Sequence, residues 1–210
     1  KNIFTTLNQV ENNFELVINF LRQKSSFIDR LMNTGIITNK TAKELGAVGI
    51  SARCAGIDID TRLNHPYAAY SNLKINQYQK TPRDITQHKV EIQKRVGDAL
   101  SRFEIRIDEI KDSINIIKSV LNNLGNDNLC VSLTGKLTPF GQALGYAESH
   151  RGQTMHWIMI DEHEHIFRYK IRTASFCNWP LIEQAVINDI IPDFPLINKS
   201  LDLSYSGNDL

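Results

Sequence analysis

The longest regular pattern in this sequence is a row of apolar residues spaced alternately four and three positions apart. Its members are Val96, Leu100, Phe103, Ile107, Ile110, Ile114, Ile117, Leu121 and Leu124. A sustained heptad pattern predicts a long packed helix, here over residues 84–124, with Pro82 before its start and Gly125 at its end.

A second apolar face on the same segment bears on where this helix lies. It is formed by Ile105, Ile116 and Val120. Two apolar faces favour a central place in a helix bundle, although a free coiled-coil dimer also satisfies the pattern. The charged residues in mid-helix are expected to form a solvated or interface face. They are Arg102, Arg106 and Glu109.

The segment before this helix contains two further helix signals. Residues 8–33 carry apolar residues mostly on one face and end at Thr34-Gly35, which predicts one amphipathic helix. Thr38 is a typical N-cap for a second, short helix that should end at Gly46.

Residues 46–72 combine helix-breaking residues with a concentration of charge. The charged residues are Arg53, Asp58, Asp60, Arg62 and His65. The stretch is too apolar for a flexible linker, so we expect an ordered, partly buried loop held by charge pairs. Such a loop could carry function or could simply be a structural crossing between helices.

The periodicity changes after residue 128. Residues 129–133 are compatible with a short strand, and a turn-rich stretch with several glycines follows. Residues 155–160 and 166–172 then predict a β-hairpin whose polar connection is residues 161–165. The second strand places Arg168, Lys170 and Arg172 on one face.

Two short helices are expected at the end of the chain, over residues 181–190 and 196–201, separated by Pro192 and Pro195. The predicted fold class is α+β, predominantly α-helical: a long-helix bundle with a small antiparallel β-hairpin. The 210 residues suit a single domain, with a helical part at 1–127 and a hairpin and C-terminal part at 128–210.

Charge and composition exclude several functions. The net charge of +1 argues against nucleic-acid binding, which usually needs a basic surplus. No apolar run reaches the roughly 18 residues of a membrane-spanning helix. The three scattered cysteines form neither a disulfide framework nor a typical metal motif, and we expect them to be reduced and buried. These are Cys54, Cys130 and Cys177.

The run from Asp161 to His165 contains five potential metal ligands in a row. His163 and His165 could point the same way on a strand. The spacing fits no specific metal site, and a hairpin tip must be polar in any case, so a solvated turn is the competing interpretation.

Several segments together resemble a known family. They are GAVGISARCAGIDIDTR from residue 46, GDALSRFEIRIDE from 97, GYAESHRG from 145, FRYKIRTASFCNW from 167 and SLDLSYSGND from 200. Their order and spacing resemble the large subunit of the energy-converting [NiFe] hydrogenases, including the formate hydrogenlyase type. That family is shared with the large core subunit of respiratory complex I, which performs NADH:quinone oxidoreduction. The resemblance covers most of residues 34–210.

The resemblance implies a subunit of a membrane-associated oxidoreductase complex. Its partners would be a small subunit carrying a [4Fe–4S] cluster, other subunits of the assembly, indirectly a membrane arm, and a quinone. Through the likeness to complex I, it also implies a link to NAD binding. It further implies that the chain lies in the cytoplasm, at the inner face of the cell membrane. The abrupt start at Lys1 suggests the C-terminal portion of a longer subunit.

The family resemblance also locates the nickel ligands. Hydrogenases of this family hold nickel and iron with two C-x-x-C pairs, and the second pair corresponds here to Ser204 and Gly207. Neither residue offers a thiolate, so no [NiFe] centre and no other cofactor is expected in this chain. The final arginine of the family is replaced by Leu210.

The resemblance assigns cavity positions residue by residue. Arg53 falls in the family's charged loop, Glu148 and Arg151 occupy the Glu-x-x-Arg-Gly motif, and Arg172 and Asp202 flank the lost metal position. Such groups tune redox potentials and move protons. We therefore expect a nickel-free, quinone-linked redox subunit. The alternatives are a non-catalytic scaffold or remnant whose ion pairs only hold loops together, and an active hydrogenase that takes its ligands from elsewhere.

Overall fold

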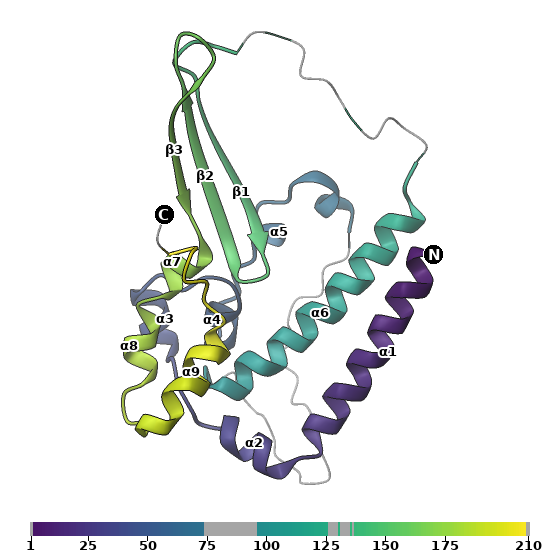
Figure 1. The fold of residues 1–210 in the computed structure, drawn as a ribbon, viewed down its shortest axis with the longest axis vertical. Coiled ribbons are helices and arrows are strands. Elements are labelled where there is room, and N and C mark those ends of the chain that lie inside the picture. Colours follow the sequence, from purple (N-terminus) through teal and green to yellow (C-terminus); the bar gives the residue numbers. More distant parts are fainter. Residues whose placement is uncertain (1, 74–95, 126–129, 131–134, 136, 209–210) are drawn as a thin grey trace.

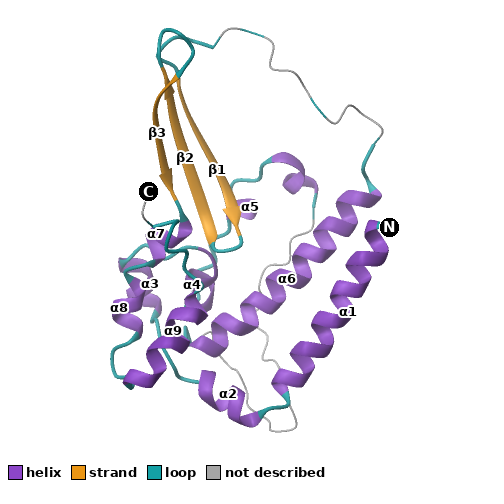
Figure 2. Cartoon of the chain, in the orientation of Figure 1, coloured by secondary structure: helices purple, strands orange, loops and turns teal. Residues whose placement is uncertain are grey.

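The computed structural model describes residues 2–73, 96–125, 130, 135 and 137–208 (Figure 1). Within these ranges the chain is predominantly helical with one small antiparallel sheet, which confirms the predicted fold class. Helices gather at one end of the molecule, and the sheet projects from them (Figure 2). None of the helices in these ranges combines the length and the apolar character needed to cross a membrane.

The long helix α6 spans Ala99–Asn122. It begins later than the heptad pattern predicts, because Gly97 has a positive φ of 81° and Asp98 is extended and caps the helix by accepting from Ser101 N–H. Residues 84–95 of the predicted helix lie outside the described residues. Leu100, Ile107 and Ile114 of the heptad row are buried, whereas later members become exposed.

The first predicted helix is two helices, α1 (Ile3–Arg22) and α2 (Ser25–Leu31). The prediction of one continuous helix was wrong because Lys24 is extended at the junction. Helix α1 lies beside α6 and antiparallel to it (Figure 1). Three ion pairs follow this antiparallel register: Arg22–Glu104, Glu15–Lys111 and Glu11–Lys118.

The charged segment after residue 46 is more regular than the predicted loop. It forms α4 (Gly49–Cys54), α5 (Thr61–Asn64) and the 3₁₀ helix η1 (Ala68–Asn72). It is ordered and held by charge pairs, as expected. The preceding helix α3 (Asn39–Glu44) is capped by Thr38, whose hydroxyl accepts from Thr41 N–H, which confirms that prediction.

The sheet has three antiparallel strands in the order β1–β2–β3, one more than the predicted hairpin. They are β1 (Gln142–Ser149), β2 (Gly152–Ile160) and β3 (Ile166–Arg172). Strand β1 was missed because its glycine and alanine residues have low strand propensity. The strand proposed for residues 129–133 falls almost wholly outside the described residues.

The C-terminal helices pack against the α3–α4 region and α6. They are α7 (Ala174–Asn178), α8 (Leu181–Ala185), the 3₁₀ helix η2 (Ile191–Asp193) and α9 (Phe194–Leu201). Helix α8 ends earlier than predicted, and Pro195 lies in the first turn of α9, where proline is well tolerated. The largest core cluster joins Ile37, Leu181, Ile197 and several alanines.

Candidate functional site

Arg53 lies at the centre of a buried charge cluster. Helix α4 carries it, and its side chain is only 1% exposed. Its Nε donates to Glu109 Oε1 on α6 at 2.7 Å, and its Nη1 donates to Glu148 Oε1 on β1 at 2.9 Å. The Nη1 group also donates to the Ile59 carbonyl at 2.9 Å. One guanidinium therefore joins a short helix, the long helix and the sheet.

A second arginine completes the cluster. Arg62 on α5 binds Asp60 through two parallel hydrogen bonds, of 3.0 Å from Nε and 2.6 Å from Nη2. Asp60 also lies 3.8 Å from Arg53 Nη1. Burial acts to raise the pKa of Asp60, but the hydrogen bonds and charges of Arg62 and Arg53 outweigh it and hold this pKa below its ordinary value.

Buried groups of both signs meet in this cluster. Arg53 and Arg62 face Asp60, Glu109 and Glu148, and Arg106 of the adjoining pocket adds a positive charge near Glu109. Burial raises the pKa of Glu109, and the charge of Arg53 only partly offsets this. Burial therefore favours the protonated form of Glu109 relative to an exposed glutamate.

A pocket of about 340 Å³ opens against this cluster. Its lining combines carboxylates, arginines, neutral polar or aromatic side chains and two isoleucines: Ile50, Arg62, Tyr70, Arg106, Glu109, Ile110, Ser113, Glu148, Ser149, His150 and Asp202. The guanidinium of Arg106 donates to the Ser200 carbonyl at 3.3 Å, and burial lowers its pKa. The pocket thus brings charged groups of both signs together with polar side chains and two isoleucines.

Arg151 and Asp202 meet at the edge of this pocket. Arg151 Nε donates to the Asp202 carbonyl, and Arg151 Nη2 lies 3.5 Å from Asp202 Oδ1. Glu148 lies near the end of β1, and Arg151 occupies the hairpin turn between β1 and β2. The turn rests on α4, where Gly49 and Gly152 approach each other closely.

Arg172 lies farther out than the other predicted site residues. It is exposed on β3 and does not line the pocket. Its Nη2 donates to Gln153 Oε1, and Gln153 Nε2 donates to Thr61 Oγ1 at 3.2 Å. Thr61 N–H in turn donates to Glu148 Oε2, so Arg172 is connected to the cluster only through these intermediates.

Ser204 and Gly207, the positions that the family resemblance assigns to the nickel ligands, lie in direct contact. Ser204 Oγ accepts from Gly207 N–H at 3.1 Å, and a Cβ added at Gly207 would lie 3.2 Å from that oxygen. The Gly207 carbonyl accepts from the Thr173 hydroxyl. These groups are a neutral hydroxyl and backbone atoms, so this donor set does not fit the soft nickel–iron centre.

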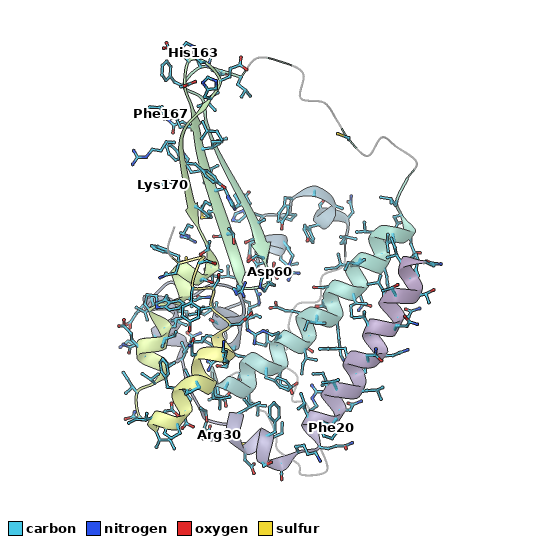
Figure 3. All side chains as sticks on the ribbon, viewed as in Figure 1. Phe20, Arg30, Asp60, His163, Phe167 and Lys170 are labelled. Carbon is cyan, nitrogen blue, oxygen red and sulfur yellow. The ribbon has the colours of Figure 1, made fainter. Side chains whose placement is uncertain are left out.

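The acidic and histidine-rich hairpin tip has a structural explanation. Asp161 Oδ1 accepts from the backbone N–H groups of His163 and His165 at 2.8 and 2.9 Å. These bonds lower the pKa of Asp161 and fix the turn. Figure 3 shows His163 at the far tip of the sheet and Asp60 near its base. Across the described residues, no three His, Cys, Asp or Glu side chains are grouped to hold a metal ion.

Sequence reasoning misjudged the charged residues of α6. Arg102 is fully buried, and the Glu109 side chain is only 12% exposed, so the expectation of a solvated or interface face was wrong for them. Helix α4 and helix α9 cover this face of α6. Arg102 hydrogen-bonds Ser200 and two backbone carbonyls there. The sequence did contain a sign of this burial. Arg102 and Glu109 lie on the same face of the helix as Ile105, which belongs to the second apolar row.

The cysteines differ in exposure, and this gives a testable difference in reactivity. Cys54 is buried, and burial raises its pKa to about 11, whereas Cys130 is exposed, so the expectation of three buried cysteines was wrong. Because the thiolate is the reactive form, Cys130 should react with an aromatic disulfide reagent in the native protein while Cys54 does not. Peptide mapping after brief labelling checks this, with denatured protein as the control. Equal labelling of Cys54 and Cys130 in the native protein would contradict the burial of Cys54.

Comparison with known proteins places these motifs in a family. The family model "Respiratory-chain NADH dehydrogenase, 49 Kd subunit" matches residues 1–136 and 129–209. Formate hydrogenlyase subunit 5 of Escherichia coli strain K12 is 29% identical over 96% of this chain and 33% of its own length. A subunit of the NADH-quinone oxidoreductase of Anaeromyxobacter dehalogenans strain 2CP-C is 28% identical over 90% of this chain and 47% of its own length.

The fold is also shared with a solved structure. A chain of the membrane-bound sulfane sulfur reductase, an archaeal respiratory membrane complex, matches with a TM-score of 0.84 at 24% identity, over 99% of this chain and 54% of that one. The chain thus spans about a third to a half of the lengths of these relatives. From the match along nearly its whole length, the chain belongs to the family of the respiratory-chain NADH dehydrogenase 49 Kd subunit.

Proposed function

We propose that this chain works as a nickel-free subunit of a membrane-associated oxidoreductase complex of the hydrogenase and complex I type, linked to a quinone. The supporting observation is the pocket of about 340 Å³ bordered by the buried cluster of Arg53, Glu109 and Glu148. Within this cluster, burial raises the pKa of Glu109. A carboxylate of this kind accepts and releases protons next to a group that changes its charge.

The pocket suits a quinone headgroup chemically. Quinone reduction adds two electrons and two protons, so it requires proton donors within reach of the headgroup. Glu109 and Tyr70 bear dissociable protons, Arg106 supplies hydrogen-bond donors, and Ile50 and Ile110 supply apolar contacts. In this proposal Glu109 passes protons toward the headgroup, and Arg53 holds its carboxylate in position.

Electrons would reach this pocket from a partner. The described residues provide no thiolate pair at Ser204 and Gly207, so we assign the electron donor to a small subunit carrying a [4Fe–4S] cluster. The same proposal places the chain peripherally at the inner, cytoplasmic face of the cell membrane, where a quinone is within reach. The NADH-quinone oxidoreductase and formate hydrogenlyase names of its relatives support such an assembly.

Glu109→Gln separates this proposal from a purely structural role. Glutamine keeps the shape and an acceptor for Arg53 but cannot exchange a proton at neutral pH. We expect reduction of a quinone analogue by the intact complex to fall by about tenfold or more, within the range of general acid–base effects, while the complex still assembles. Glu44→Gln, on the exposed face of α3, is the matched control and should be neutral. Unchanged turnover in Glu109→Gln would favour a scaffold.

The pH dependence of stability gives an independent check on Glu109. Its pKa is raised in the folded state, so the folded protein binds this proton more tightly than the unfolded chain. This contribution of Glu109 to the free energy of unfolding is fully present below its ordinary pKa of 4.5. It is lost as the pH rises through the raised pKa of the folded state. Urea denaturation at a series of pH values should show a steeper loss of stability over this window in the wild type than in Glu109→Gln. If the stability of the two proteins depended on pH in the same way, the pKa of Glu109 would not be raised in the folded state.

A further inference from the structure

Strand β3 has one edge without a partner among the described strands. It pairs with β2 on one side, and the sheet order ends at β3. Six of its seven residues are exposed. A long edge strand without proline presents unpaired backbone donors and acceptors, which bind an added strand readily. Figure 3 shows Phe167 and Lys170 on the outer side of the sheet, away from the helices.

The two faces of β3 have opposite chemistry. Phe167 is 68% exposed and Tyr169 is 48% exposed; Tyr169 shares one face with Ile171, and Phe167 lies where the register of the β2–β3 pair shifts. Arg168, Lys170 and Arg172 share the other face, at the roughly 7 Å spacing of alternate strand residues. Exposed aromatic side chains in a row indicate an interaction surface more strongly than isolated ones do.

The cationic row lacks carboxylate partners in the part of the chain that the structure describes. No ion pair there involves Arg168 or Lys170, and Arg172 has only the amide oxygen of Gln153 as its partner. The apolar neighbours of these cations on the same face of the sheet are Trp157, Met155 and Met159. An added strand would meet positive charge and apolar surface on one face, and aromatic surface on the other.

We propose that the free edge of β3 binds an extended segment of a partner protein in which acidic and apolar residues alternate. Its backbone pairs with the edge of Ile166–Arg172, its carboxylates lie beside Arg168 and Lys170, and its apolar residues lie beside Tyr169 and Ile171. Charge complementarity selects this occupant, because cross-strand pairs of opposite charge stabilise a sheet. This interface stands independently of the redox role.

The charge distribution favours a protein over an anionic membrane. The tip of the sheet carries the carboxylates of Asp161, Glu162 and Glu164 directly beyond the cationic row. A flat anionic lipid surface that contacted the cations would also lie close to these carboxylates. Its negative headgroups would then repel them within the screening distance of physiological salt. A strand laid along β3 contacts the cations and ends before the tip.

A designed peptide tests this inference. The probe is a capped peptide of alternating glutamate and valine, and the control has the same composition with glutamates and valines in separate blocks. Fluorescence anisotropy with the intact protein should show the alternating peptide binding at least tenfold more tightly than the control. The double variant Arg168→Glu/Lys170→Glu should lose this preference, whereas Lys43→Glu, on an exposed position of α3, should retain it.

The assembled complex supplies the second arm of the test. A photo-crosslinking residue at Phe167 should capture an acidic segment of another subunit, and Lys170→Gln should reduce that yield severalfold while the fold, checked by circular dichroism, is unchanged. Three results would overturn the inference. They are equal binding of both peptides to the protein, binding of the protein to phosphatidylglycerol vesicles but to neither peptide, and a crosslink from Phe167 only to this same polypeptide.

Discussion

Replacing Arg53 with alanine is expected to lower the free energy of unfolding by about 3–5 kcal/mol, the usual cost of removing one partner from a buried ion pair. Arg53 is almost fully buried and is bound to both Glu109 and Glu148. Its removal leaves two carboxylates inside the protein without their shared cation, while water has little access to them. Urea denaturation followed by circular dichroism measures the change.

Lys40→Ala is the matched control for this prediction. Lys40 lies 3.8 Å from Glu44 in an exposed i,i+4 pair on α3, and such pairs contribute about 0.3–0.5 kcal/mol. The two variants therefore remove the same kind of interaction in opposite environments. A loss below about 1 kcal/mol for Arg53→Ala would show that the buried cluster does not hold α4, α6 and β1 together.

Gly49→Ala is expected to destabilise the protein by about 3 kcal/mol or more, as severe core overpacking does. Gly49 has a positive φ of 62°, and an added Cβ would lie 2.2 Å from the Arg151 carbonyl oxygen and 2.4 Å from Gly152 Cα. These are backbone atoms, so the hairpin turn that carries Arg151 would have to move away from α4. The same variant should therefore disturb the pocket as well as the fold.

Gly46→Ala separates the steric effect from the backbone effect. Gly46 has nearly the same φ, 65°, but a Cβ there would meet nothing within 4 Å. Only the cost of a left-handed conformation applies, about 1–2 kcal/mol. Thermal unfolding of both variants gives the comparison. Equal losses would mean that the contact between the α4 start and the β1–β2 turn is not tight.

The sequence predicted elements best where local signals and tertiary contacts agree. Thr38 offered a side-chain cap at the correct position, and the alternation in residues 166–172 predicted β3. Strand β1 escaped prediction because its conformation depends on pairing with β2 and not on its own composition. The break at Lys24 was missed because no glycine or proline marks it.

The candidate site was only partly predictable for a similar reason. Arg53 and Glu148 were selected through family resemblance, and the structure joins them directly. Glu109 was missed because a charged residue on a long helix ordinarily faces water, and only the packing of α4 on α6 buries it. Contacts between distant segments decide which charges of a helix are buried, and periodicity alone does not contain this information.

Metal analysis of the intact complex, purified anaerobically, tests most directly whether this subunit works without nickel. Ser204 and Gly207 supply no thiolate, so nickel should fall far below one atom per chain while reduction of a quinone analogue continues. One nickel atom per chain, lost together with activity in Ser204→Ala, would contradict a nickel-free quinone-linked role.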